Sequence, residues 1–371
     1  MTARVPWIGR LAFSLAALLA GSGCVVPEYN QNVTTSEDAV LSDVTQLTRP
    51  SAVDGFDRAG GGRFSPDGRW VVFRGVPHGT PAVVPPAYGL FLAHVRWSVD
   101  GERRVISLER PLRITRPGVR CGGASFSPDG FTLIFAAAGR ADAPQGSLQL
   151  FRVDGWEQDI AMADAARGVD LAQHAVSPAD LSADESDWSP DGRSVAFAAT
   201  SVDGGPIRLY AMRPDGSHLV RLGPPTGYAR GPAFAPDGHR LLYRGDAGGS
   251  PYSQVFVAEL AFDVNHDPIG LIDPQPLTHE AGVTSSGPCW LNGGADGLRI
   301  LYATTRHGDR NAELYVMDDA GLRKTRLTLT PGPDLLPSVT ADGRHLLWTR
   351  SGSAEGAPQL FAANLHLPPG S

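Results

Sequence analysis

The chain has 371 residues, of which 42% are hydrophobic and 19% charged, so it has enough apolar material for a large core and is not a disordered protein. It carries 32 basic residues, only one of them a lysine (Lys324), against 39 acidic ones, and no basic stripe, which excludes an ordinary nucleic-acid-binding surface. Its 44 glycines and 31 prolines have no fixed period, which excludes collagen, and they separate short apolar runs as turns do.

The N-terminal segment has the pattern of an export signal. Arg4 and Arg10 precede an apolar run over 11–20, which is too short to span a bilayer, and small residues then lead to Cys24. This order resembles a bacterial lipobox, although Gly21 stands where the lipobox usually has leucine. We therefore predict a lipoprotein signal peptide over residues 1–23 and lipidation of Cys24, with plain secretion and nearby cleavage as the alternative.

The segment after Cys24 predicts the membrane to which the protein is anchored and the length of its tether. Val25, rather than an aspartate, follows the cysteine, which favours the periplasmic face of the outer membrane over the inner membrane. Residues 24–42 are polar and poor in aromatic residues, so we expect a flexible tether with a reach on the order of 25 Å.

A short motif then recurs along the chain. In its full form, an aromatic residue is followed by Ser-Pro-Asp-Gly and an apolar run; its Asp-Gly pairs stand at 67–68, 129–130, 191–192, 237–238, 296–297 and 342–343. Six positions after the aspartates come the aromatic residues Phe73, Phe135, Phe197, Tyr243, Tyr302 and Trp348. Asp-Gly is a strong tight-turn signal, and the apolar run fits a buried strand. Each copy therefore predicts a β-hairpin with the aspartate capping the turn.

Each hairpin is followed by a third apolar run, and most are followed by a further turn and a fourth strand. The third runs lie at 90–92, 150–153, 209–212, 255–257, 314–317 and 360–362. Four antiparallel strands repeated six times predict an all-β, six-bladed β-propeller over residues 43–366, with a C-terminal tail at 367–371.

The two ends of the chain are predicted to share one blade. Fourth strands end in Leu277-Thr278 and Leu327-Thr328, whereas the last repeat lacks such a strand and the same pair occurs early, at Leu47-Thr48. Residues 43–49 are therefore expected to complete the last blade, which removes the free sheet edge. A seven-bladed ring, with a degenerate unit inside 156–184, is the alternative; that stretch lacks Asp-Gly and is interpreted as an insertion, helical around 161–172.

The Ser-Pro-Asp-Gly hairpins resemble the repeat of the TolB-like β-propellers, which are relatives of the Trp-Asp repeat proteins. The stretch 312–321 is especially similar to the third and fourth strands of a TolB blade, and the resemblance covers residues 43 to about 365. TolB carries a separate α/β domain before its propeller, where this chain has the short predicted tether. The resemblance implies a propeller-only relative and does not carry over a role in the Tol–Pal system.

Polar residues near the starts of the innermost strands are the candidates for ligand or partner binding at the channel mouth. They are Arg120, Glu185, Asp187, Tyr228, Arg230 and Asp334. Arg306 and His307 follow a second strand and are expected on the opposite face. No catalytic residue is predicted, because the chain lacks the Gly-x-Ser-x-Gly elbow that propeller-containing peptidases carry in a hydrolase domain.

No metal ion or cofactor is predicted either. The stretch 263–267 resembles the start of a calcium loop, but Pro268 stands where an EF-hand needs glycine. Convergence of His279, His307 and His345 around a metal is the arrangement required by the alternative of a polyuronate lyase. Cys121 and Cys289 fall in opposite blades, which favours two buried thiols over a disulfide because bonded Cα atoms lie within about 7 Å.

The sequence therefore predicts an exported, non-enzymatic envelope lipoprotein whose monomeric propeller binds a protein or peptide partner and does not bind nucleic acid. A carbohydrate-binding or metal-assisted polyuronate lyase-like propeller is the first alternative. A purely structural component of the envelope is the second.

Overall fold

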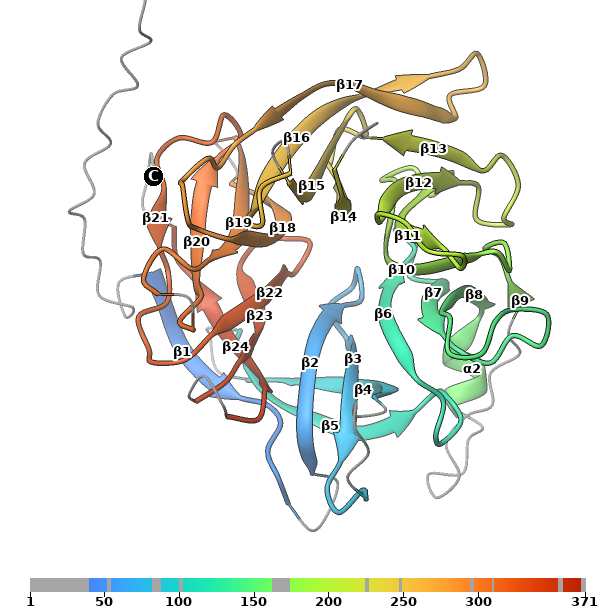
Figure 1. The fold of residues 1–371 in the computed structure, drawn as a ribbon. Coiled ribbons are helices and arrows are strands. Elements are labelled where there is room, and N and C mark those ends of the chain that lie inside the picture. The colour runs from blue at the N-terminus through green and yellow to red at the C-terminus, as the bar shows by residue number, and fades with distance from the viewer. Residues whose placement is uncertain are drawn as a thin grey trace, which may run out of the picture. The chain divides into compact units, whose positions relative to one another are not determined.

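The computed structural model describes residues 40–51, 55–81, 88–99, 103–161, 174–223, 227–246, 249–293, 297–308, 310–352 and 356–367. Within these residues the strands form six four-stranded antiparallel sheets, arranged as blades around a central axis (Figure 1). The predicted six-bladed, all-β propeller is confirmed. The predicted signal peptide, Cys24 and the predicted tether as far as residue 39 lie outside the described residues.

Each blade runs from an innermost to an outermost strand. The innermost strands are β2 (Phe56–Phe64), β6 (Cys121–Phe126), β10 (Leu181–Trp188), β14 (Ala229–Phe234), β18 (Ser285–Asn292) and β22 (Asp334–Val339). The second strands are β3 (Trp70–Pro77), β7 (Thr132–Ala137), β11 (Val195–Ser201), β15 (Arg240–Asp246), β19 (Leu298–Thr304) and β23 (His345–Arg350). The third strands are β4 (Gly89–Trp97), β8 (Gln149–Asp154), β12 (Arg208–Met212), β16 (Ser253–Phe262), β20 (Glu313–Asp318) and β24 (Gln359–Leu365).

The outermost strands are β5 (Val105–Arg113), β9 (His174–Ala175), β13 (Val220–Gly223), β17 (Pro268–Pro276), β21 (Thr325–Arg326) and β1 (Leu41–Gln46). Blades 1 to 5 are numbered in chain order from β2–β5 to β18–β21, and blade 6 consists of β22, β23, β24 and β1. Because β1 comes from the start of the chain, the first and last strands hold the ring closed.

The closing strand begins earlier than the sequence predicts. β1 pairs with β24 from Leu41, two residues before the expected start at 43, because Leu41 is almost fully buried against Leu365 in the core. The pairing continues through Thr48, whose hydroxyl accepts a hydrogen bond from the backbone N–H of Leu360 at 2.9 Å and donates one to Gln359 at 2.7 Å. The Leu-Thr pair thus marks the end of the fourth strand here, as expected.

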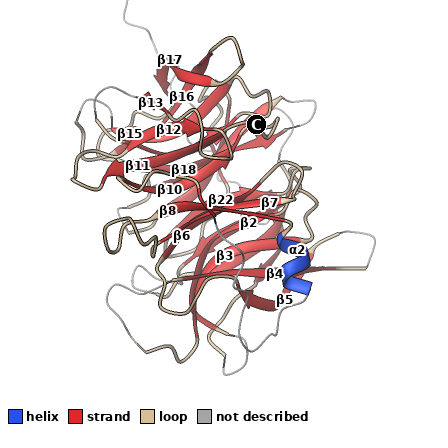
Figure 2. Cartoon of the chain, turned by 90° about the vertical axis from the view of Figure 1, so that its right-hand side faces the viewer, coloured by secondary structure: helices blue, strands red, loops and turns tan. Residues whose placement is uncertain are grey.

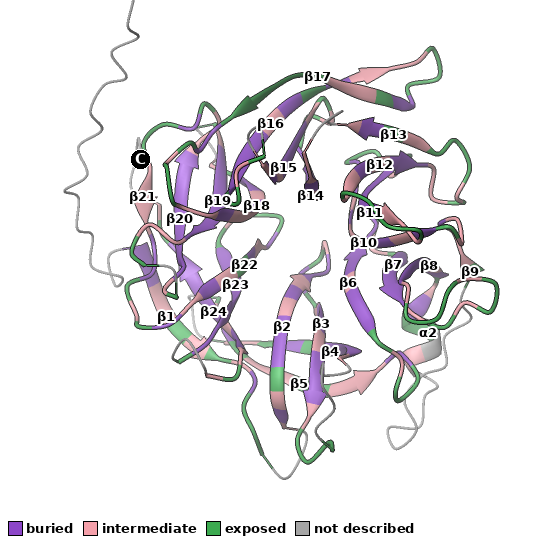
Figure 3. Cartoon of the chain, viewed as in Figure 1, coloured by how far each residue is buried: buried purple, intermediate pink, exposed green. Residues whose placement is uncertain are grey.

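The six repeated aromatic residues form the centre of the blades. All six are at most 2% exposed, and each faces an aromatic residue at the paired position of the third strand. The ring centroids of these pairs lie 5.3–5.9 Å apart. Cross-strand aromatic pairs stabilise a sheet beyond the area that they bury. Figure 3 shows the buried residues concentrated in the inner strands of each blade.

The repeat aspartates cap turns, as predicted. In the five copies that the structure describes, the carboxylate accepts a hydrogen bond from the backbone N–H two residues ahead, at 2.9–3.1 Å. Neighbouring turns also pack together. If Gly130 or Gly192 carried a Cβ atom, that atom would lie 3.7–3.8 Å from the proline in the corresponding turn of the preceding blade. Asp296 lies outside the described residues.

The stretch 156–184 contains a helix and the missing fourth strand of blade 2. The helix α2 (Trp156–Ala161), drawn blue in Figure 2, follows the third strand of blade 2, and its Trp156 is buried, with Nε1 donating to the carbonyl oxygen of Gly130 at 3.0 Å. This anchor explains why the helix begins at 156; the predicted helical residues 162–172 lie outside the described ones. β9 pairs with β8, so the stretch completes blade 2 and adds no seventh blade.

Candidate functional site: the central channel

Every innermost strand carries a β-bulge. In blade 1, two residues of the innermost strand, between Gly60 and Arg63, lie opposite one residue of the second strand, and the other blades have the same irregularity at the corresponding place. A bulge bends the strand and turns side chains that would otherwise follow the regular alternation. The six bulges therefore shape the wall of the channel.

Two bulges hold a side chain in a conformation that favours glycine. The first bulge residue has a φ of 58–65° at Gly61, Gly231 and Gly287, whereas the same position is Glu185 in blade 3 and Leu336 in blade 6, with φ of 53° and 54°. A left-handed φ costs an L-residue about 1–2 kcal/mol. Such outliers persist where the surroundings hold them in place, and they occur preferentially at functional sites.

The bulges enclose a cavity of about 690 Å³. Its wall takes residues from all six innermost strands, which surround the axis of the propeller (Figure 1). The cavity is therefore the central channel. Glycines of four blades leave the middle of the cavity open because they have no side chain. Gly61, Gly62, Gly123, Gly231 and Gly287 line it.

One side of the channel is charged. Blades 1, 3 and 4 contribute Arg63, Arg74, Asp184, Glu185, Asp187, Arg230 and Arg244. We call these residues the charged wall. Its members belong to two groups, one centred on Glu185 and one on Asp187.

Glu185 lies between two arginines of blade 4. The Nε of Arg230 donates to its Oε2 at 2.9 Å, Nη2 of the same arginine contacts Oε1, and Nη2 of Arg244 lies 3.8 Å from Oε1. Burial raises the pKa of Glu185, but the hydrogen bond and charge of Arg230, with Arg244 and Arg74, hold its pKa below the ordinary value. Glu185 is therefore kept as a carboxylate.

Asp187 links blade 3 to its neighbours. It accepts hydrogen bonds from Nη1 of Arg63 and from the backbone N–H of Phe234, both at 2.9 Å. Burial raises its pKa above the ordinary value despite these partners. Asp184 is likewise engaged, accepting from the backbone N–H of Gly123 at 2.7 Å and from that of Glu185 at 2.8 Å.

The opposite side of the channel is mostly apolar. Blades 5 and 6 contribute Pro288, Cys289, Trp290, Leu335, Leu336, Pro337 and Val339. We call these residues the apolar wall. Leu336 is 38% exposed although it is a large hydrophobic residue, and Gly287 of the neighbouring bulge packs against its backbone. Cys121 and Cys289 are free thiols, as the sequence favoured; Cys121 is buried, while Cys289 is only partly so and has its pKa raised to about 12 by desolvation.

Three of the predicted site residues, Glu185, Asp187 and Arg230, belong to the charged wall. Arg120 and Tyr228 do not line this cavity. Arg120 is exposed next to β6, and the backbone N–H of Tyr228 donates to Asp246 at 2.6 Å.

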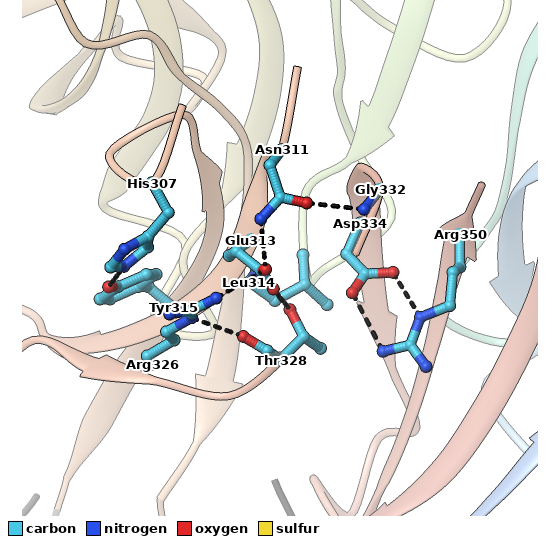
Figure 4. Close-up of polar contacts among 10 residues, drawn as sticks. All are labelled: His307, Asn311, Glu313, Leu314, Tyr315, Arg326, Thr328, Gly332, Asp334 and Arg350. Carbon is cyan, nitrogen blue, oxygen red and sulfur yellow. Dashed lines mark hydrogen bonds and ion pairs between the residues drawn. The ribbon is translucent and has the colours of Figure 1, made fainter. Parts of the chain in front are cut away.

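Asp334 is a correction. It is fully buried and belongs to a closed polar cluster between blades 5 and 6 (Figure 4), because it binds Nε1 of Trp348 at 2.9 Å and both Nε and Nη2 of Arg350 at 2.8 and 3.0 Å. Burial raises its pKa, and the contacts to Arg350 oppose that rise. A carboxylate with no exposed surface cannot meet a ligand in the channel, so the prediction for Asp334 is wrong.

Arg306 and His307 also lie away from the channel. Arg306 contacts the carboxylate of Glu280, and its guanidinium carbon is 5.5 Å from the ring centroid of Tyr315. His307 stacks on the same ring and bonds its hydroxyl at 2.5 Å (Figure 4). Burial lowers the pKa of His307, and the charges of Arg326 and Arg306 add to that effect.

The histidines of the polyuronate lyase alternative have separate surroundings. His345 is buried, with Nε2 2.8 Å from the backbone oxygen of Arg103, whereas His279 is exposed. Over the described ranges, no three His, Cys, Asp or Glu side chains are placed to share a metal ion. The stretch 263–267 forms a hairpin loop in which Asp263 accepts from the backbone N–H groups of Asn265 and Asp267 at 2.8 and 2.9 Å.

The charged wall contains residues that sequence reasoning missed, namely Arg63, Arg74, Asp184 and Arg244. Two of them could have been found from the repeats. The residue after the second-strand aromatic is arginine at 74 and 244, but alanine at 136, 198 and 303 and threonine at 349. A large, positively charged side chain at a position that otherwise holds alanine or threonine departs from the structural repeat. Glu185 and Leu336 depart from it in the same way at the glycine position of the bulge.

Sequence comparison connects this ring to a known group of propellers. The chain is 31% identical over 156 residues to a Protein TolB homolog of Chlorobium chlorochromatii, a match that covers 42% of this chain and 30% of that protein. Over this stretch the chain is similar to TolB, and its fold is a six-bladed β-propeller. The match to this curated relative thus spans under a third of the relative's length, and no protein-family profile matches the chain.

Solved structures share the fold of this chain. A putative TolB from Agrobacterium tumefaciens superimposes with a TM-score of 0.51 at 15% identity, covering 84% of this chain and 91% of that one. A protein of unknown function from Dyadobacter fermentans gives 0.57 at 14% identity, covering 88% and 99%. At these identities the likeness concerns the fold alone. Among the helices of the described residues, none is long and apolar enough to cross a membrane.

Proposed function

We propose that this TolB-like propeller is a non-enzymatic lipoprotein of the bacterial cell envelope whose central channel binds a peptide segment of a partner protein. The observation that carries the proposal is the two-sided channel, in which the charged wall faces the apolar wall across a cavity of about 690 Å³. Ligand sites combine an apolar surface with a few well-placed polar groups in cavities of about 300–1,000 Å³. An extended peptide presents side chains to both sides and matches such a channel.

The chemistry of the charged wall suits recognition. Glu185, with its pKa below the ordinary value, stays ionised and arginine-bound, and is a poor general acid. Asp184 and Asp187 are engaged by backbone N–H groups of their own and neighbouring blades. These groups hold charge in a fixed place, which selects and orients a ligand.

The experiment is site-specific photo-cross-linking in whole cells. A photoactivatable residue at Leu336, which is exposed on the channel wall, should yield a reproducible adduct with one protein or peptide. The matched control is Ile106, an apolar residue of similar exposure (42% against 38%) on the outermost strand β5. Equal adduct patterns at 336 and 106, or none at 336, would contradict a channel partner.

The lipoprotein part of the proposal rests on the sequence around Cys24 and has its own test. A Cys24→Ser variant should lose incorporation of labelled palmitate, because the thiol is the group that the lipid would modify. Fractionation of inner and outer membranes then reports where the acylated protein resides. Palmitate labelling that persists in Cys24→Ser would show that the site of modification is elsewhere.

A further inference from the structure

The charged wall contains more positive than negative groups at one place. Arg230 and Arg244 occupy paired positions on the neighbouring strands β14 and β15, where like charges repel. The carboxylate between them comes from the neighbouring blade, as Glu185. One carboxylate thus serves two facing arginines.

Arg74 adds a third guanidinium to this place. If Gly61 carried a Cβ atom, that atom would lie 3.2 Å from Nη2 of Arg74. The side chain of Arg74 therefore extends along the bulge that lines the channel. Its charge acts on the Glu185 carboxylate, together with those of Arg230 and Arg244. In the part of the chain that the structure describes, Arg74 makes no ion pair with a carboxylate.

The other acidic groups of the wall already have partners of their own. Asp184 accepts from two backbone N–H groups, and Asp187 is bound to Arg63 and to the backbone of Phe234. The charge of Asp184 acts on Arg230 beside that of Glu185, and the wall as a whole holds four arginines against three carboxylates. Arg244 is only 26% exposed, so water solvates its charge incompletely.

We propose that this place binds a carboxylate of the ligand, seated among Arg74, Arg230 and Arg244 beside Glu185, while a neighbouring apolar side chain of the same ligand packs on Leu335, Leu336 and Pro337. The inference rests on the proposed function and specifies the ligand as an acidic peptide with hydrophobic residues next to the acid. Guanidinium groups bind carboxylates through paired, charge-assisted hydrogen bonds, which are stronger where water is excluded.

The apolar wall decides between the carboxylate-bearing ligands. A polyuronate also carries carboxylates, but its hydroxyl groups would lie against leucine and proline side chains that offer them no hydrogen bonds. An acidic peptide places aliphatic side chains there and leaves its carboxylate to the arginines. The strained φ of Leu336 is consistent with this use, because it places a leucine where the bulges of blades 1, 4 and 5 have glycine.

The test compares three probes on the full chain by fluorescence anisotropy and competition. They are a fluorescein-labelled, end-blocked pentapeptide with aspartate between two leucines, its asparagine counterpart, and unlabelled trigalacturonate as competitor. We expect the aspartate peptide to bind at least about tenfold more tightly than the asparagine peptide, since a charged hydrogen bond is worth that much or more. Arg244→Gln should remove that preference, and so should Arg74→Gln, which breaks no ion pair that the described residues contain.

The matched control is Arg221→Gln on the outer strand β13, which removes an exposed arginine away from the channel and should leave both affinities unchanged. If both peptides bind equally, the carboxylate site is wrong while peptide binding stands. If neither peptide binds and the photo-cross-link at 336 is also absent, both proposals fail. If trigalacturonate displaces the aspartate peptide at concentrations well below those at which the unlabelled peptide does, the peptide is overturned in favour of the carbohydrate.

Discussion

The protein has two clusters in which arginines meet carboxylates, one in the channel and one between blades 5 and 6. In the channel, Arg74, Arg230 and Arg244 share Glu185 and border a cavity. In the second cluster Glu313 binds Arg326, Thr328 and Asn311, and Asp334 binds Arg350 (Figure 4). Asp334 also accepts a hydrogen bond from Trp348. Both carboxylates of the second cluster have no exposed surface.

The two clusters differ in how many oppositely charged or hydrogen-bonding partners each charged side chain has. Asp334 and Arg350 use their hydrogen-bonding groups on one another, and Asn311 closes the cluster by accepting from the backbone N–H of Gly332 at 2.7 Å. Such a cluster holds two blades together and has no capacity for a ligand. The channel cluster has an excess of cations beside open space, which is the property of a binding site.

The largest expected effect comes from breaking the closed cluster. Asp334→Ala leaves the guanidinium of Arg350 buried without its carboxylate, and we expect it to lower the free energy of unfolding by about 3–5 kcal/mol. Chemical denaturation followed by tryptophan fluorescence measures this. The double variant Asp334→Leu with Arg350→Met should recover most of the loss; a loss below about 1 kcal/mol in the single variant would mean that the pair does not hold the blades.

A smaller effect is expected at Glu313, where the repeats offer a natural comparison. Gln149, Gln254 and Gln359 occupy the same place in blades 2, 4 and 6, and their amide groups donate to backbone carbonyl oxygens in or just before the innermost strand of the next blade round the ring. Glu313 instead accepts from Arg326 at 2.7 Å. Glu313→Gln should cost about 1–3 kcal/mol in the same denaturation measurement, because Arg326 loses its charged partner. An unchanged midpoint would show that glutamine serves equally well in blade 5.

In the channel, Glu185→Gly should change stability little and binding strongly. The variant loses a partly exposed ion pair but relieves the left-handed φ, and the two effects are each about 1 kcal/mol and opposite in sign. The net change in unfolding free energy should stay below about 1 kcal/mol, while the aspartate peptide should bind more tightly because a competing carboxylate is gone. A stability loss like that of Asp334→Ala would place Glu185 in the framework of the fold.

The smallest effect is an opposite response of the two clusters to acid. The pKa of Glu185 is lowered in the folded protein, so its contribution to stability is present above the ordinary glutamate range and is lost as the pH falls from that range through the lower pKa of the folded state. The pKa of Asp334 is raised, so its contribution is greatest at low pH and falls as the pH rises between the unfolded and folded pKa values. Carboxyl-carbon NMR titration separates the two; a shared direction of shift would contradict the comparison.

Much of the fold could be predicted from the sequence because each copy of the repeated motif makes the same structural contacts. Asp-Gly fixes a turn, and the aromatic residue six positions later must be buried, as Phe73 and its five counterparts are. The Leu-Thr pair at 47–48 identified the closing strand because the threonine has a fixed partner, the backbone of the third strand, in blade 6 as in blades 4 and 5. Local chemistry sufficed wherever each blade repeats the same contact.

The sequence by itself determined the number of blades, the closure of the ring and the role of the repeat aspartates, since these depend on turns and strand pairs close along the chain. Only the tertiary structure decided which polar residues face the channel. Asp334 and Glu185 both lie in innermost strands, yet one is buried between blades and the other is turned into the cavity by a bulge. Side-chain direction at a bulge, and the approach of Arg74 and Arg230 from different blades, depend on the closed ring, which no local pattern describes.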